Sequence, residues 1–169
     1  NSLGITLREL GRLEEAEASH RQAVALEPGY SSAHNNLGNT LRELGRLGEA
    51  EASLAQAIAL KPDYAEAHSN LGITRQALGR SDEAEVSLQQ AIALKPDFVD
   101  AHYNLGTTLR ELGRLDEAAA SYRRAIALKP DYPSAKHILA ALTGETTAAA
   151  PQDYVEELFD DYATKFEGA

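Results

Sequence analysis

The sequence predicts an all-α chain in which short pairs of helices repeat and stack on one another. The main observation is a period of 34 residues, which is shared by Leu3-Gly4, Leu37-Gly38, Leu71-Gly72 and Leu105-Gly106. A second glycine and a proline recur with the same period, at Gly11, Gly45, Gly79 and Gly113 and at Pro28, Pro62, Pro96 and Pro130. Self-similarity at a fixed period of this length is typical of stacked repeats, so we expect small units rather than one closed globule.

Each unit is expected to contain two helices, which we call helix A and helix B. In the second unit, apolar residues recur at helical spacing over residues 31–44 and again over residues 48–60. Gly45 is expected to end helix A, because glycine adopts the left-handed conformation at little cost. Pro62 follows helix B and could not continue it, so it closes the unit.

The motif of this second unit resembles the tetratricopeptide repeat. It runs from His34 through Leu37-Gly38 and Leu41 to Ala50 and Leu54, and then to Pro62. The resemblance implies a right-handed solenoid of antiparallel helix pairs over residues 1–143. The units are expected at about 1–30, 31–64, 65–98 and 99–132, followed by a capping helix over 133–143 and a linker over 144–150.

Composition excludes several classes of partner and site. The net charge is -10 and no basic stripe is present, which argues against nucleic acid and anionic membranes. The chain has no cysteine, so it can form neither a disulfide nor a thiolate metal site. The chain starts inside a predicted helix A and does not begin with methionine, so we expect a fragment of a longer protein. We also expect a cytoplasmic location.

No catalytic motif is found. The sequence lacks a Gly-x-Gly-x-x-Gly run, a phosphate loop, a Cys/His pair and a Gly-x-Ser-x-Gly elbow, so we expect neither an enzyme nor a cofactor in this chain. His34, His68 and His102 stand one period apart, but metal ligands lie about 2 Å from one ion. Helices pack ~8–10 Å apart, so a shared metal site is not expected.

Two further patterns have alternative interpretations. Tyr30, Tyr64, Phe98 and Tyr132 recur after the prolines, and they either stack on a ligand or pack between units; packing is favoured because it requires regular repetition. Arg75 takes the place of a leucine found in the other units. We expect its stem to lie along apolar surface with a solvated head, and a specific anion contact is the alternative.

The candidate binding residues follow from the resemblance, because stacked A helices line the concave face in this family. They are Asn35, Asn36, Asn39, Arg42, Asn70, Gln76, Tyr103, Asn104, Thr107 and Arg110. Asn36, Asn70 and Asn104 form a column of amides, which can both donate to and accept from a peptide backbone. The alternative is that these amides bond neighbouring helices or water.

This column also resembles the repeats of O-linked N-acetylglucosamine transferases, through Asn-Leu-Gly followed by Leu-Gly-Arg. Repeats that clamp the C-terminal carboxylate of chaperones place a lysine where this chain has Asn35, Ser69 and Tyr103. A chaperone-adaptor role is therefore not expected. The favoured function is a protein- or peptide-binding scaffold. For the parent protein, the repeat region of such a glycosyltransferase and a free-standing scaffold are two alternatives to a methyltransferase, which the last segment of the chain suggests.

The last segment, residues 151–169, has an apolar side and an acidic side at helical spacing. Its run from Leu158 to Phe166 resembles the entry to the catalytic domain of bacterial methyltransferases that carry tetratricopeptide repeats. The resemblance implies a parent that uses S-adenosylmethionine. The apolar side is expected to dock on a repeat surface of its own or a neighbouring chain, and the N-terminal end offers a second surface for self-association. The docking residues are Tyr154, Leu158, Phe159, Tyr162 and Phe166.

Overall fold

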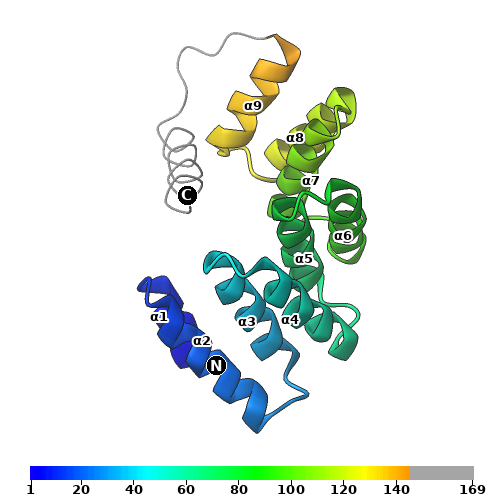
Figure 1. The fold of residues 1–169 in the computed structure, drawn as a ribbon. Helices are drawn as coiled ribbons and strands as arrows, with labels where there is room; N and C mark the ends of the chain where they lie inside the picture. The colour runs from blue at the N-terminus through cyan, green and yellow to red at the C-terminus, as the bar shows by residue number, and fades with distance from the viewer. Residues whose placement is uncertain (145–169) are drawn as a thin grey trace. The chain divides into compact units, whose positions relative to one another are not determined.

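The computed structural model describes residues 1–144, which form two compact units divided at Pro96 and Asp97. The first unit contains α1 (Ser2–Glu9), α2 (Leu13–Leu26), α3 (Ser31–Glu43), α4 (Leu47–Leu60), α5 (Ala65–Ala77) and α6 (Ser81–Leu94) (Figure 1). The second contains α7 (Val99–Glu111), α8 (Leu115–Leu128) and α9 (Pro133–Thr143). The described elements are all helices, as the period predicts. The docking residues Tyr154, Leu158, Phe159, Tyr162 and Phe166 and most of the predicted linker lie outside the described residues.

A left-handed glycine separates the two helices of each pair. Gly45 has a φ of +75°, and Gly11, Gly79 and Gly113 adopt nearly the same angle. The Arg46 N–H donates to the Leu41 carbonyl at 2.9 Å, and the Gly45 N–H donates to the Arg42 carbonyl at 3.0 Å. These bonds satisfy carbonyls that the end of α3 would otherwise leave unpaired. The turn therefore lies where the sequence places it.

A second glycine sets the distance between α3 and α4. A Cβ atom at Gly38 would lie 2.6 Å from Leu54 Cγ and 3.2 Å from the Ala50 carbonyl oxygen. Ala50 and Leu54 are both fully buried. In the second and third repeats the Leu-Gly pair thus combines a buried leucine, Leu37 or Leu71, with a point of close helix contact.

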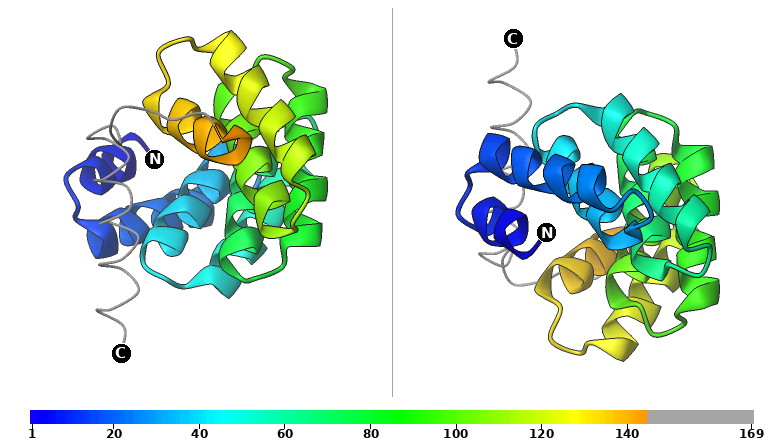
Figure 2. Two further views of the ribbon diagram at one scale, coloured as in Figure 1. Left: turned by 90° about the horizontal axis from the view of Figure 1, so that it is seen from above. Right: turned by 90° about the horizontal axis from the view of Figure 1, so that it is seen from below.

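In the first unit, successive helices pack against each other from α1 to α6. The A helices α1 and α3 are also in contact, and so are α3 and α5; α1 and α2 lie side by side in Figure 2. Candidate residues on these three A helices are therefore brought together across repeats. Of the helices in residues 1–144, none is long and apolar enough to cross a membrane.

In the second unit, α8 packs between α7 and α9, around a core of larger side chains. Buried Tyr122 lies with its ring centre 5.6 Å from that of Tyr103, and Tyr103 stacks on Tyr132 at 5.0 Å. Tyr132 packs against the same cluster as Leu109 and Ile138. The packing interpretation of the aromatic column thus holds for Tyr132.

Candidate functional site

Four asparagines form a continuous chain of hydrogen bonds from the start of α1 across α3 to α5. Asn70 Nδ2 donates to Asn35 Oδ1 at 2.9 Å, and Asn35 Nδ2 donates to Asn36 Oδ1 at 3.5 Å. Asn36 Nδ2 then donates to Asn1 Oδ1 at 3.0 Å. The first and last of these bonds join successive repeats, and they are equivalent to each other, because Asn70 and Asn35 lie one period after Asn36 and Asn1. Asn36 and Asn70 therefore bond to the preceding repeat, which is the alternative that the sequence left open for these amides.

The chain of amides continues into the core of the first repeat. His20 is fully buried, and its Nδ1 donates to Asn1 Oδ1 at 3.1 Å. Burial lowers the pKa of His20 to about 4, and the positive charge of Arg8 adds to this effect. The ring is therefore neutral at pH 7. Leu54, Leu88 and Tyr122 occupy the equivalent positions in the other repeats, so His20 is a packing residue, as the period predicts.

Two other candidates on α3, Asn39 and Arg42, lie in a more unusual environment. Asn39 is 8% exposed, and its Oδ1 has no hydrogen-bond partner within residues 1–144. Arg42 is half-buried, and its Nε atom likewise lacks a partner there. Burial lowers the pKa of Arg42, Glu43 opposes this effect, and the positive charge of Arg8 adds to it. A guanidinium nevertheless keeps its charge in proteins.

Of the remaining candidates, Gln76 lies on α5, and the other four lie on α7 in the second unit. Tyr103 is half-buried in the aromatic core. Thr107 Oγ1 lies 3.0 Å from the Tyr122 hydroxyl and donates to the Tyr103 carbonyl. Asn104 and Gln76 are half-buried, whereas Arg110 is exposed. Tyr103 and Thr107 thus contribute to packing, and the part that these residues play in binding stays a prediction.

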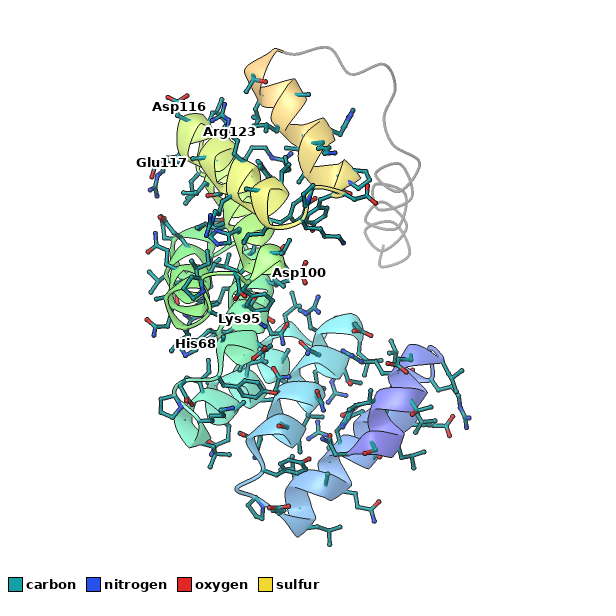
Figure 3. The ribbon with its side chains drawn as sticks, turned by 180° about the vertical axis from the view of Figure 1, so that it is seen from behind. His68, Lys95, Asp100, Asp116, Glu117 and Arg123 are labelled. Carbon is teal, nitrogen blue, oxygen red and sulfur yellow. The ribbon has the colours of Figure 1, made fainter. Side chains whose placement is uncertain are left out.

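The histidine column has a structural role that its spacing did not reveal. His34 Nε2 donates to the Pro28 carbonyl at 3.0 Å. His68, labelled in Figure 3, makes the same bond to the Pro62 carbonyl at 2.9 Å. Each of these histidines therefore fixes the proline turn that precedes its own helix. A signal for this was present in the sequence, because a histidine follows Pro28, Pro62 and Pro96 by six residues in each case.

The structure corrects the expectation for Arg75. Its head is not merely solvated, because Arg75 Nε pairs with Glu51 at 3.0 Å and its Nη1 donates to Ser87 Oγ at 3.0 Å. Arg80 binds the other oxygen of Glu51 at 2.7 Å. The contact is with a carboxylate of the same chain rather than with an external anion. Sequence reasoning missed the partner because Glu51 lies on a different repeat.

The arginine that precedes each helix B forms a repeating ion pair. Arg46 binds Glu49 in its own helix at 2.7 Å and Glu17 of the preceding repeat at 2.7 Å. Hydrogen bonds from Arg46 and Arg21 hold the pKa of Glu49 below its usual range. Glu17 also has a lowered pKa, although burial opposes the effect of Arg21 and Arg46. The first-turn acid thus pairs with the arginine that precedes its own helix, and Glu17 and Glu51, which lie further along α2 and α4, carry the ion pairs to the next repeat.

A shallow hollow of about 400 Å³ lies on the side of the B helices in the first unit. Ile58, Leu71 and Val86 supply apolar walls, and Arg75 and Ser87 supply polar ones. Val86 is 65% exposed. This surface was not among the candidates, since it is formed by residues from three helices and two repeats. Within residues 1–144, no group of three His, Cys, Asp or Glu residues could hold a metal ion.

Comparisons with known proteins agree with this geometry. Family models of the tetratricopeptide repeat match residues 1–26, 21–52, 38–79 and 69–133. No curated protein sequence matches the chain. Tetratricopeptide repeats support a protein-interaction scaffold.

Several solved structures have the same fold. TTC0263, a thermophilic TPR protein of Thermus thermophilus, is 30% identical over 83% of this chain and 78% of its own, with a TM-score of 0.74. MamA is 26% identical over 98% of this chain and 95% of its own, with a TM-score of 0.75. The first TPR of Spaghetti (RPAP3), bound to the HSP90 peptide SRMEEVD, is 22% identical over 68% and 90% of the two chains, with a TM-score of 0.66; it shows the fold alone. The chain is a member of the tetratricopeptide repeat family.

Proposed function

We propose that this chain is a non-catalytic scaffold that binds a protein or an extended peptide along its A helices. The observation that carries the proposal is the chain of amides across α1, α3 and α5. Each carboxamide nitrogen has two hydrogens, and the bonds described for Asn36 and Asn70 use one of them. Both side chains are half-buried and held in place, so a ligand would lose little freedom in ordering them.

A peptide partner is also supported by the RPAP3 domain, which has this fold and was solved with a bound peptide. The chemistry of recognition in the present chain is expected to differ from a lysine clamp. Asn35, Ser69 and Tyr103 stand at the positions concerned, and none of them is cationic. Amides instead favour contacts to a peptide backbone, which depend little on the peptide sequence.

The test is to select peptides from a random library on the immobilised chain and to map the bound site by hydrogen exchange. Binding along the A helices of the first unit is expected to slow exchange in α1, α3 and α5. Slowing confined to α4 and α6, near the hollow beside Val86, would contradict the proposal. In that case the B-helix side would be the binding surface.

A variant test uses Asn36, Asn70 and Asn104 together, all replaced by alanine. Affinity for a selected peptide is expected to fall, because each lost hydrogen bond contributes ~0.5–1.5 kcal/mol. Two of these residues also join repeats, so the unfolding free energy of the variant has to be measured alongside its affinity. The matched control is Gln89→Ala, which removes an exposed amide from α6 and should leave affinity unchanged. Unchanged affinity in the triple variant would reject the role of the amide column.

The parent protein is proposed to be a methyltransferase, on the strength of the run from Leu158 to Phe166, which lies outside the described residues. A glycosyltransferase of the N-acetylglucosamine type and a free-standing scaffold are the alternatives. Calorimetric titration of this chain with S-adenosylmethionine is expected to give no heat, because no nucleotide-binding loop is present in its sequence. A glycine-rich motif after a strand, in the parent sequence beyond Ala169, would favour the methyltransferase.

Self-association and a cytoplasmic location complete the proposal. The apolar side of residues 151–166 is proposed to dock on a repeat surface, because burying one large apolar side chain contributes ~1.5–3 kcal/mol. Deletion of residues 145–169 is expected to change the mass measured by light scattering or the melting temperature. No change in either quantity would reject docking.

A further inference from the structure

One side of α1 exposes residues whose equivalents in the second repeat are buried. Leu3 is 65% exposed, whereas Leu37, one period later, is 5% exposed. Thr6 is exposed as well, whereas the equivalent Thr40 is fully buried. Leu3, Thr6 and Leu10 follow the spacing i, i+3 and i+7, so they lie along the same side of the helix. We call these three residues the open side of α1.

The same side of α3 is covered by the preceding repeat. Both α1 and α2 pack against α3. Val24 of α2 packs against the cluster that contains Leu37 and Leu41. An ion pair joins the same two repeats, because Arg46 Nη1 donates to Glu17 at 2.7 Å. A helix that covers this side therefore supplies an apolar side chain and an acid.

The first repeat also has the arginine that would receive such an acid. Arg12 is the equivalent of Arg46, and its Nε and Nη2 atoms bind Glu15 of its own repeat. In Arg46 and Arg80 the Nη1 atom binds an acid of the preceding repeat. Arg12 Nη1 makes no corresponding bond within residues 1–144. The open side of α1 thus lacks both contacts that its equivalent in α3 has.

A simpler explanation is that these are ordinary surface residues, since single exposed apolar side chains are common. That explanation does not account for the burial of the whole equivalent set in α3. A second copy of the chain could in principle supply one of its B helices as a cover. However, α2, α4 and α8 each pack against the A helix that follows them, so these three helices are already occupied.

The segment 151–166, which lies outside the described residues, has a sequence with both required features. It is slightly longer than α2 and α4, which have 14 residues each. Its apolar residues recur at helical spacing, and its acids are Asp153, Glu156, Glu157, Asp160 and Asp161. The segment can therefore offer apolar side chains to Leu3 and Leu10 and a carboxylate to Arg12.

We infer that the segment 151–166 docks on the open side of α1, with one of its acids bound to Arg12. This inference rests on the docking of that segment under the proposed function, and it names the surface. The segment occupies the place that the preceding repeat takes on α3. The mass of the docked species shows whether the segment comes from the same chain or from a neighbouring copy.

The test uses the full chain, which contains no cysteine of its own. Thr6→Cys is combined with Ala163→Cys, and the pair is treated with a short bis-maleimide. Ala163 lies four positions after Phe159, so it is beside the apolar side and leaves the docking residues intact. Cross-linking is expected to be several times faster than in the control pair Gln90→Cys and Ala163→Cys. Gln90 is exposed and lines the hollow beside Val86, which is the competing apolar surface.

A second comparison tests the contact with Arg12. Arg12→Glu in the Thr6→Cys and Ala163→Cys chain should slow cross-linking, because it repels the acids of the segment. The matched control is Arg123→Glu, an exposed arginine on α8 (Figure 3), which should leave the rate unchanged. Circular dichroism of both variants checks that the helix content is retained.

The outcomes separate this surface from docking in general. Faster cross-linking at Gln90→Cys than at Thr6→Cys overturns the inference, because the segment then docks on the hollow. Equal rates at the two positions also overturn it. If deletion of residues 145–169 nevertheless changes the mass or the melting temperature, docking stands and only the open side of α1 is rejected. A rate that Arg12→Glu leaves unchanged overturns the contact with the acids.

Discussion

The two units join their repeats with different chemistry at equivalent positions. In the first unit, Asn70 donates to Asn35 across the joint at 2.9 Å. In the second unit, the equivalent positions hold Ile138 and Tyr103, which pack in an apolar cluster. One repeat pattern therefore accommodates either a hydrogen bond or apolar contact at the same joint. The stability of the polar joint depends on the geometry of a hydrogen bond, whereas that of the apolar joint depends on how well the side chains fill the space between the helices.

The core position that faces the glycine of the Leu-Gly pair also differs between the two units. Tyr122 fills it in the second unit, whereas His20, Leu54 and Leu88 fill it in the first. Substitutions at the two sets of positions can therefore test whether volume matters more in the second unit and polar pairing more in the first. The expected effects are given below from the largest to the smallest.

Replacing Tyr122 by alanine should have the largest effect. The side chain is fully buried, and its hydroxyl lies 3.0 Å from Thr107 Oγ1. Large-to-small changes of buried aromatic residues cost ~3–5 kcal/mol, so the second unit should unfold at much lower urea concentration, followed by circular dichroism. Tyr122→Leu, which introduces the residue found at Leu54 and Leu88, should cost clearly less. Equal losses in the two variants would contradict a joint that depends on volume.

Acid should destabilise the first unit through His20. Its pKa is about 4 in the folded chain and 6.5 as the usual value, so below pH 6.5 the unfolded chain binds a proton that the folded chain does not. The free energy of unfolding should therefore fall as the pH drops from about 6.5 towards 4, by roughly 2 kcal/mol between pH 7 and pH 5.

His20→Leu is the matched variant, because leucine fills this position in the next two repeats. Denaturation curves at pH 7 and pH 5 should show that the variant lacks this part of the pH dependence. The carboxylates titrate in both proteins, so the difference between the two isolates the histidine. The same pH dependence in both proteins would mean that His20 is not the group responsible.

Asn70→Ala should weaken the polar joint by roughly 1–2 kcal/mol. It removes one hydrogen bond and leaves the buried Asn35 Oδ1 without a donor. Ile138→Val is the comparison in the second unit, where loss of one methyl group from the apolar joint should cost ~0.5–1.5 kcal/mol. Urea denaturation measures both changes. An unaffected Asn70→Ala variant would show that the amide bond contributes nothing to the joint.

The smallest effect is expected for Arg75→Leu, which restores the residue of the other repeats. Glu51 keeps its pair with Arg80 at 2.7 Å, so the loss of Arg75 leaves no unpaired buried acid. Replacing a partly buried ion pair by an apolar side chain is often neutral, and a change below about 1 kcal/mol in either direction is expected. A loss of several kcal/mol in thermal or urea denaturation would instead give the Arg75 network a major structural role.

The sequence by itself determined the helices and turns, because these depend on local conformation. Gly45 was expected to end helix A, and it adopts a left-handed φ of +75°. The boundaries of α3 and α4 differ from the expected ones by one residue at most. Gly38 recurs with the period, and the structure gives the reason, because a Cβ atom there would lie 2.6 Å from Leu54 Cγ.

Only the tertiary structure decided which polar side chains are paired and which are not. The period places Asn36 and Asn70 on the predicted concave face. It does not show whether their amides bond neighbouring helices or are available to a ligand. The pairing of Arg75 with Glu51, and the lack of a partner for Arg42 Nε within residues 1–144, depend on residues more than twenty positions away or on another repeat. Hydrogen bonds and ion pairs are short-range and directional, so a fraction of a turn in the helix orientation decides whether they form.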